Sequence, residues 1–182
     1  MRKIVILLSV LVALVAFFSL GLAQDSTKTE AKAAAKETKE VKHDYVGVTK
    51  CKGCHKAQFD AWSETPHSKA WDALSAEEQK KPECVTCHET GKTSGESPEM
   101  LTGVQCEACH GPGADYKSFK IMNKKKWGED PEGQLKLAKE AGLIIPTADD
   151  CTRCHKKEGN PNYKPFDFEK MKDKVHPIKA EG

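Results

Sequence analysis

The cysteines constrain this chain more than any other feature, because all eight belong to a repeated Cys-x-x-Cys-His box. The four boxes are Cys51-Lys-Gly-Cys54-His55, Cys84-Val-Thr-Cys87-His88, Cys106-Glu-Ala-Cys109-His110 and Cys151-Thr-Arg-Cys154-His155. This spacing is the attachment signature of c-type haem. Two thiols three positions apart form thioethers to one porphyrin, and the adjacent histidine reaches the iron as proximal ligand. The sequence therefore predicts four covalently bound haem c groups.

Two other kinds of site also use paired cysteines. Four-sulfur zinc sites are built from Cys-x-x-Cys pairs, and the cysteines of exported proteins form disulfides. Neither alternative explains a histidine after every box. Histidine fills 7 of the 182 positions, so its presence after all four boxes by chance has odds of roughly one in half a million. The histidines therefore favour haem.

The first 23 residues have the pattern of an export signal. A short basic start at residues 1–3 precedes an apolar run at 4–20, and small residues follow at 21–23. We predict a signal peptide over residues 1–23 and a periplasmic protein. If the signal is not cleaved, the run is nearly as long as the roughly 20 residues that span a bilayer. The protein would then be anchored to the membrane.

The next segment is rich in Ala, Lys, Glu and Thr. Because such a composition cannot bury an apolar face, we predict a charged flexible linker over residues 24–44. One tetrahaem cytochrome c domain is expected over residues 45–182. Only about 135 residues then enclose four haems, so the porphyrins should supply most of the core.

The overall charge excludes one class of partner. The chain has 29 Lys and Arg against 27 Asp and Glu. Loss of residues 1–23 removes Arg2 and Lys3 and no acidic residue, which leaves the mature polypeptide formally neutral. Haem propionates add negative charge, so a strongly basic nucleic-acid surface is not expected.

We predict a mainly α fold, a compact multihaem cytochrome c of short helices and loops. The capping residues and apolar spacing indicate helices at residues 56–64, 67–80, 131–141 and 168–175. Gly111-Pro112-Gly113 follows the third box and predicts a tight turn.

The histidine count limits the axial ligands. His55, His88, His110 and His155 are the predicted proximal ligands, which leaves His43, His67 and His176 for four distal positions. At least one iron therefore lacks a second histidine from this chain. It is five-coordinate, or it binds Met, Lys, water or a histidine of another molecule.

Three segments resemble the cytochrome c-554 family, namely 65–70, 100–113 and 166–176. Its members are periplasmic tetrahaem electron carriers, best known from hydroxylamine oxidation by ammonia-oxidising bacteria. The resemblance implies a mainly helical fold wrapped around four stacked haems. It also implies three bis-histidine irons beside one five-coordinate iron.

The same resemblance implies roles for single residues. His67 becomes the distal ligand of the third haem, whose proximal ligand is His110. His176 becomes the distal ligand of the fourth haem, whose proximal ligand is His155. The second haem, bound by His88, is the open one.

One departure from the family concerns the first haem. Family members place its distal histidine shortly after the Gly-Pro-Gly turn, but this chain has no histidine between Gly111 and Asp150. His43 is the expected substitute, since it lies eight residues before Cys51, a span that extends to roughly 27 Å. Weaker candidates are Met122, Lys120 and the cluster Lys124-Lys125-Lys126.

The leading functional interpretation is electron transfer between redox proteins. The donor would be a dehydrogenase or quinol oxidase, and a terminal reductase would be the acceptor. One alternative is reduction of nitric oxide or another small nitrogen oxide at the open second haem. Another is a membrane-tethered or filament-forming conduit in which His43 ligates a neighbour's iron. The lysine cluster 124–126 is either a solvated loop or a docking surface for an acidic partner.

Overall fold

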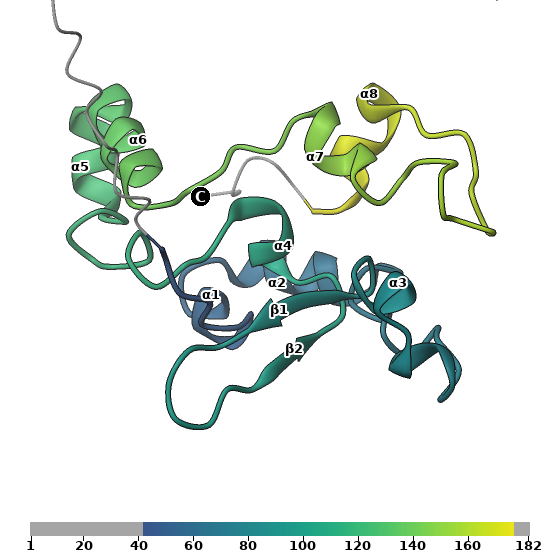
Figure 1. Cartoon of the computed structure of the whole chain (residues 1–182). Helices are drawn as coiled ribbons and strands as arrows, with labels where there is room; N and C mark the ends of the chain where they lie inside the picture. Colours follow the sequence, from purple (N-terminus) through teal and green to yellow (C-terminus); the bar gives the residue numbers. More distant parts are fainter. Residues whose placement is uncertain (1–41, 177–182) are drawn as a thin grey trace, which may run out of the picture. The chain divides into compact units, whose positions relative to one another are not determined.

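Short helices and one small sheet make up the regular structure of the protein. The computed structural model describes residues 42–176, so the predicted signal peptide and most of the predicted linker lie outside it. The longer helices are α2 (Lys56–Ser63), α5 (Lys124–Glu129) and α6 (Pro131–Glu140), as Figure 1 shows. The shorter ones are α1 (Thr49–Lys52), α3 (Pro82–Val85), α4 (Cys106–His110), α7 (Ala148–Thr152) and α8 (Phe168–Met171), with 3-10 turns η1 (Glu78–Lys80) and η2 (Lys172–Lys174). The prediction of a mainly helical fold is confirmed.

Helix α6 begins and ends where the sequence predicts. The Asp130 side chain accepts a hydrogen bond from the Gly133 N–H at 2.9 Å, and Pro131 occupies the first turn. Asp130 is therefore the N-cap residue. Pro131 lies in the first turn, where the backbone N–H that proline lacks would have no helical partner. Gly142 ends the helix with φ of +97°, a conformation that glycine adopts without strain. Helix α6 packs beside α5 (Figure 1).

The helix predicted at residues 67–80 does not form. Residues 66–73 form a series of turns instead, and only Glu78–Lys80 is a 3-10 turn. Two backbone carbonyls of this segment have other partners: the His67 carbonyl accepts from the Val104 N–H at 3.0 Å, and the Ala70 carbonyl lies 2.5 Å from His88 Nδ1. Tertiary hydrogen bonds therefore prevail over the local helical pattern here.

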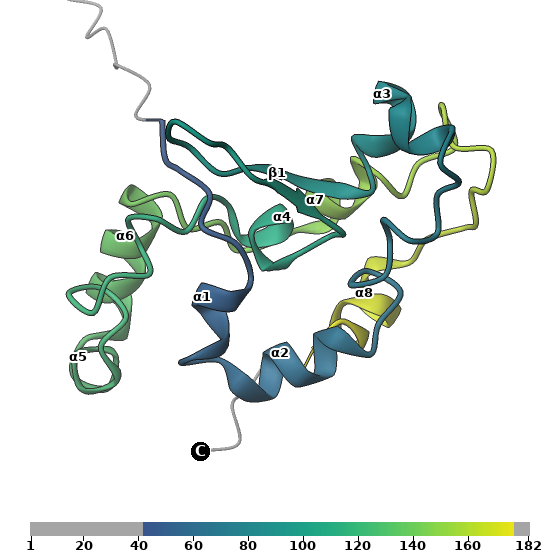
Figure 2. The same ribbon diagram turned by 90° about the horizontal axis from the view of Figure 1, so that it is seen from below.

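An antiparallel hairpin that the sequence pattern did not predict links the second box to the third. Strand β1 (Glu89–Lys92) follows His88 directly and pairs with β2 (Met100–Thr102). Leu101 is buried, and the Thr90 hydroxyl donates to the Gly103 carbonyl and accepts from the Gln105 N–H, both at 2.8 Å. The hairpin contacts α4, as Figures 1 and 2 both show. It thereby fixes the connection from the second box to the third.

The polypeptide itself forms only a small apolar core. Among residues 42–176, the buried apolar side chains are those of Ala70, Leu101, Tyr116 and Ala138. All described residues belong to one compact unit, Glu40–Gly182, and a unit of this size ordinarily buries far more apolar surface. A small core of this kind fits a protein whose prosthetic groups supply the missing apolar contacts.

No helix within residues 42–176 is long and apolar enough to cross a membrane. The apolar run at 4–20 lies outside the part of the chain that the structure describes.

Candidate haem sites

Each box begins on a short helix. Cys51 lies in α1, Cys84 in α3, Cys106 in α4 and Cys151 in α7. Only α4 spans a whole box, and its helical turn places Cys106, Cys109 and His110 on the same face. In the first and fourth boxes the histidine N–H donates to the first cysteine's carbonyl, at 3.0 and 2.9 Å. In Figure 2, α1 and α2 flank the rest of the first box.

The sulfur atoms of the boxes remain available for a cofactor. All eight cysteines are free thiols. Within the described range, no group of three or more His, Cys, Asp or Glu side chains is arranged to hold a metal ion. The disulfide and four-sulfur zinc arrangements are thus not seen in residues 42–176.

Two pairs of histidine rings lie at a distance that fits an iron between them. The centroids of His67 and His155 are 5.9 Å apart, and those of His110 and His176 are 6.0 Å apart. A histidine nitrogen lies about 2 Å from a bound transition metal, so two rings that flank one iron have centroids roughly 6 Å apart. The ring planes differ by 67° and 29°. Rotation about the bond from nitrogen to metal permits either angle.

The observed ring pairs differ from the ligand pairs that the resemblance implies. The resemblance implied His67 with His110 and His176 with His155, but the structure brings together His67 with His155 and His110 with His176. The physical reason is the course of the turns at residues 66–73. The Val104 N–H bonds the His67 carbonyl, and the His88 ring bonds the Ala70 carbonyl. These two bonds fix the direction of the segment that carries His67.

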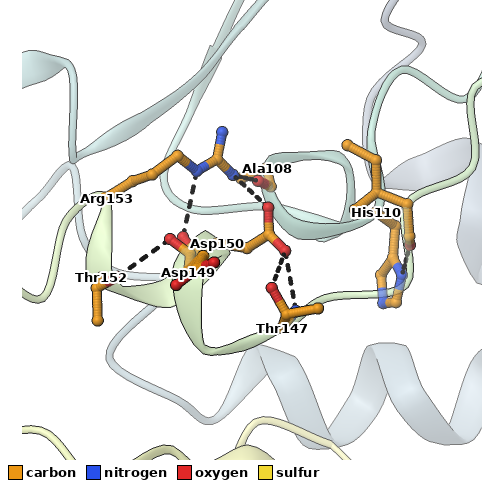
Figure 3. A network of polar contacts seen from close by, with 8 residues as sticks. Ala108, His110, Thr147, Asp149, Asp150, Thr152 and Arg153 are labelled. Carbon is orange, nitrogen blue, oxygen red and sulfur yellow. Dashed lines mark hydrogen bonds and ion pairs between the residues drawn. The ribbon is translucent and has the colours of Figure 1, made fainter.

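Backbone carbonyls orient two of the histidines that are predicted as proximal ligands. His88 Nδ1 lies 2.5 Å from the Ala70 oxygen, and His110 Nδ1 lies 3.1 Å from the Ile144 oxygen, which Figure 3 shows for His110. A carbonyl oxygen only accepts, so Nδ1 carries the proton and Nε2 keeps its lone pair. This is the usual arrangement of a metal-ligating histidine.

Burial keeps three of these rings in the neutral form. It lowers the pKa of His67, His110 and His155, and for His67 the nearby His155 adds to the effect. Neutral imidazole is the form that binds metals. His155 also stacks on Phe166, with centroids 4.6 Å apart. The Phe166 ring therefore restricts the orientation of His155.

Interactions between cysteines of different boxes indicate which boxes are neighbours. A hydrogen bond with Cys106 raises the pKa of Cys51, and this contact joins the first box to the third. Burial and then the Cys151 thiol raise the pKa of Cys109, which joins the third box to the fourth. Burial and then a hydrogen bond with Cys87 raise the pKa of Cys154 to about 12, which joins the fourth box to the second. The resulting order is first, third, fourth, second.

Arg153, an internal residue of the fourth box, strengthens one of these junctions. Its Nη2 donates to the Ala108 carbonyl of the third box at 3.1 Å, and its Nε donates to the Asp150 carbonyl at 3.2 Å (Figure 3). Asp150 in turn accepts from the Thr147 N–H and hydroxyl, both at 2.9 Å. The position of Arg153 between two cysteines gave no sign of this role.

His43 has a partner that the sequence did not indicate. Its Nδ1 lies 2.7 Å from Asp115 Oδ2, two residues after the Gly-Pro-Gly turn. The Asp44 carbonyl accepts from the Ala114 N–H at 3.0 Å. The fold thus already includes the last residues of the predicted linker.

The weaker distal candidates are mostly at the surface. Lys120 is exposed, as are Lys124, Lys125 and Lys126, which begin helix α5 rather than a loop. Met122 is half-buried. These residues make none of the histidine ring contacts described above.

Sequence reasoning also missed the most deeply buried charged side chain. Glu107, an internal residue of the third box, is 1% exposed. Its carboxylate accepts from the backbone N–H groups of Val46, Gly47 and Gly113. An acidic residue between two cysteines resembles a surface position, so only the structure reveals its role.

Comparisons with known proteins show which proteins this chain resembles. A family model described as cytochrome c554 and c-prime matches residues 50–111. The curated cytochrome c-554 of Nitrosomonas europaea is 33% identical over 148 residues, which cover 64% of this chain and 60% of the relative. This chain thus spans somewhat less than two thirds of that relative's length.

A solved structure is similar to this chain as well. The reduced state of cytochrome c554 from Nitrosomonas europaea matches with a TM-score of 0.55 and 27% identity, covering 78% of this chain and 89% of that one. The small core, the free thiols and the spacing of the histidine rings all fit covalently bound haem. The resemblance seen in three sequence segments is confirmed, and so is the predicted cofactor, haem c. The chain is thus similar to cytochrome c554 in both sequence and fold.

Proposed function

We propose that this chain is an exported electron carrier that receives electrons from one redox protein and delivers them to another. When bound, haem c supplies an iron that takes up and releases one electron at a time. The observation that carries the proposal is the order of the boxes. Two hydrogen bonds between thiols and one electrostatic interaction between thiols, together with the bond from Arg153 Nη2 to the Ala108 carbonyl, join the four boxes in one series within residues 51–155.

In this proposal the residues of the boxes have two roles. The eight cysteines attach the four haems, and His55, His88, His110 and His155 are the proximal ligands. His67 is the distal partner of His155, and His176 is the distal partner of His110. A histidine on each side of an iron leaves no axial position for a substrate, which favours electron transfer over catalysis. Bis-histidine ligation also favours lower potentials than methionine and histidine together.

The ends of the series are the first and second boxes. An electron donor that docks near one end and an acceptor that docks near the other would use all four haems. Export to the periplasm follows from the expected signal peptide, and haem attachment in bacteria takes place in that compartment. A dehydrogenase or quinol oxidase as donor and a terminal reductase as acceptor fit such a carrier.

We assign the remaining spare histidine, His43, to the first haem. The rings of His67 and His176 lie against His155 and His110, and His43 is bonded to Asp115. All three spare histidines therefore have partners other than His88. This distribution supports an open iron at the second box.

The observation that favours a second function is that none of the ring contacts described above for the spare histidines involves His88. An open iron there would allow reduction of nitric oxide or another small nitrogen oxide at the second haem. A reductase needs proton donors beside that iron, whereas a carrier does not.

The two functions are distinguished by one experiment on the reduced holoprotein. Its reoxidation by an oxidised acceptor cytochrome is followed by stopped-flow absorbance, and then the consumption of nitric oxide is followed with an electrode in the presence of excess chemical reductant. We expect all four haems to be reoxidised by the protein acceptor, and nitric oxide to bind at one haem without sustained turnover. Continuous nitric oxide consumption together with slow reoxidation by proteins would contradict the carrier function.

A further inference from the structure

A short backbone segment, residues 43–48, lies across the start of the third box and is held there by side chains of that region. We call it the strap. Glu107 accepts from the Val46 N–H at 3.0 Å (Oε1) and 3.2 Å (Oε2), and from the Gly47 N–H at 2.7 Å. Gln105 Oε1 accepts from the Val48 N–H at 2.9 Å. The strap is thus fixed along most of its length.

Glu107 is suited to this role because it is buried with donors on both sides. The Gly113 N–H, from the turn after the third box, donates to its Oε1 at 2.6 Å. A buried carboxylate that lost these donors would be unsatisfied at a high cost in free energy. The strap and the turn after the third box are therefore held together as one unit.

His43, at the beginning of the strap, is held from two further sides. Its side chain is 17% exposed, and its Nδ1 donates to Asp115 Oδ2 at 2.7 Å. On the other side it packs against the backbone of Gly142, where an added Cβ would lie 2.7 Å from His43 Cδ2. An ionised carboxylate only accepts, so Nδ1 carries the proton and Nε2 keeps its lone pair.

The neighbourhood of this ring includes the first box. Tyr116, next to Asp115, is buried, and burial followed by the nearby Cys51 thiol raises its pKa. Its hydroxyl donates to the Gly111 carbonyl at 3.0 Å. Asp115 thus neighbours a residue that is near Cys51 of the first box and bonded to Gly111, which follows the third box.

We propose that Asp115 is a positioning residue that orients His43 as the distal ligand of the first haem, and that Glu107 anchors the strap that carries it. This inference rests on the assignment of His43 under the proposed function. A carboxylate bonded to the second nitrogen of a metal-ligating histidine fixes the ring and raises its basicity. Asp115 then stabilises the ferric state of that iron relative to the ferrous state.

The test compares four variants of the monomeric holoprotein, each shown by mass to carry four haems. They are His43→Ala, Asp115→Ala, Asp115→Asn and the matched control Asp44→Asn. Asp44 is exposed and lies on the same strap, next to His43. The spin state of each oxidised protein is measured by EPR, and the four midpoint potentials are measured by spectroelectrochemistry.

We expect His43→Ala to convert one additional iron to high spin, and Asp115→Ala to convert a fraction of the same iron. Asp115→Asn keeps an oxygen acceptor but loses the charge, so that iron should stay low-spin while one midpoint potential shifts to a more positive value. Asp44→Asn should leave both the spectrum and the potentials as in the wild type. Because Asp115 is 58% exposed, its variants are expected to fold.

The outcomes distinguish the positioning role of Asp115 from the assignment of His43 as ligand. If His43→Ala changes the spin count but both Asp115 variants match Asp44→Asn, Asp115 has no positioning role and the inference is overturned, while His43 remains the ligand. If His43→Ala changes nothing, the ligand assignment and the inference fail together. Electron transfer to a protein acceptor is measured separately and does not depend on either result.

Glu107→Gln tests the anchor by a different readout. It keeps the side-chain shape but loses the charge that faces the strap N–H groups. We expect faster hydrogen exchange at the Val46 and Gly47 amides, with Glu83→Gln as a control at an exposed acidic residue next to Cys84. Exchange rates equal to those of the wild type would remove Glu107 from the proposal.

Discussion

At the scale of single residues, the ring pairs His67–His155 and His110–His176 carry the proposed assignment of distal histidines to haems. In this proposal, both members of a pair bind one iron. Substitution of either histidine of a pair would therefore change the spin state of the same iron, and substitution of both would change no other iron. This non-additivity identifies partners without requiring assignment of individual spectra.

Double variants apply this argument. We expect His67→Ala, His155→Ala and the double variant of the two to lose the signal of one low-spin iron each. The combination His67→Ala with His110→Ala should lose two. EPR spin counts of the oxidised holoproteins provide the measurement. The reverse pattern, with one iron lost in the second combination, would restore the pairing of His67 with His110.

The sequence predicted these residues better than it predicted their partners. The boxes and the count of spare histidines follow from composition and spacing alone. Which ring faces which depends on tertiary contacts such as the Val104 N–H bond to the His67 carbonyl. The roles of Glu107 and Asp115 depend on where the strap crosses the third box, and no local pattern encodes that crossing.

At the scale of elements, the local sequence predicted a helix correctly where the segment has a capping residue and its backbone makes few tertiary hydrogen bonds. Helix α6 illustrates this, with Asp130 at its start and Gly142 after its end. The segment 66–73 has helical spacing too, but its carbonyls bond Val104 and His88. The hairpin β1–β2 was missed because its strands are only four and three residues long.

The cap of α6 gives a prediction about stability. Asp130→Ala removes the acceptor for the Gly133 N–H and should lower the free energy of unfolding by about 1 kcal/mol. Asp130→Asn should stay close to the wild type, because asparagine caps equally well. Denaturant unfolding followed by far-UV circular dichroism provides the measurement, with the haem absorbance unchanged under native conditions. An equal loss in both variants would mean that the charge, not the cap, stabilises this helix.

At the scale of the whole molecule, the boxes are neighbours in the order first, third, fourth, second. Haems attached in this order would pack against one another, so a small apolar core of the polypeptide is enough to hold the fold. Neighbouring boxes share cysteine contacts, and Arg153 bonds the third box to the fourth. The sequence predicted that porphyrins supply the core. It did not predict the order of the boxes, because this order differs from their order along the chain.

Partner docking is a further property at this scale. Lys124 and Lys126 are exposed at the beginning of α5. Changing both to Glu should slow electron transfer to an acidic physiological partner at low ionic strength, because it reverses the charge that accelerates encounter. The haem spectra should not change. Stopped-flow rates over a range of salt concentrations check this, with Lys80→Glu and Lys81→Glu as a control of equal charge. If both pairs slow the reaction equally, only net charge matters and α5 is not a docking site.

The most direct test of the account is the intact mass of the purified protein under denaturing conditions. Denaturation releases metal ions and non-covalent cofactors but retains thioether-bound haem. We predict a polypeptide that begins near Gln24 and carries four haem increments. A mass with fewer than four increments, or a native protein that contains zinc in place of iron, would contradict the central claim.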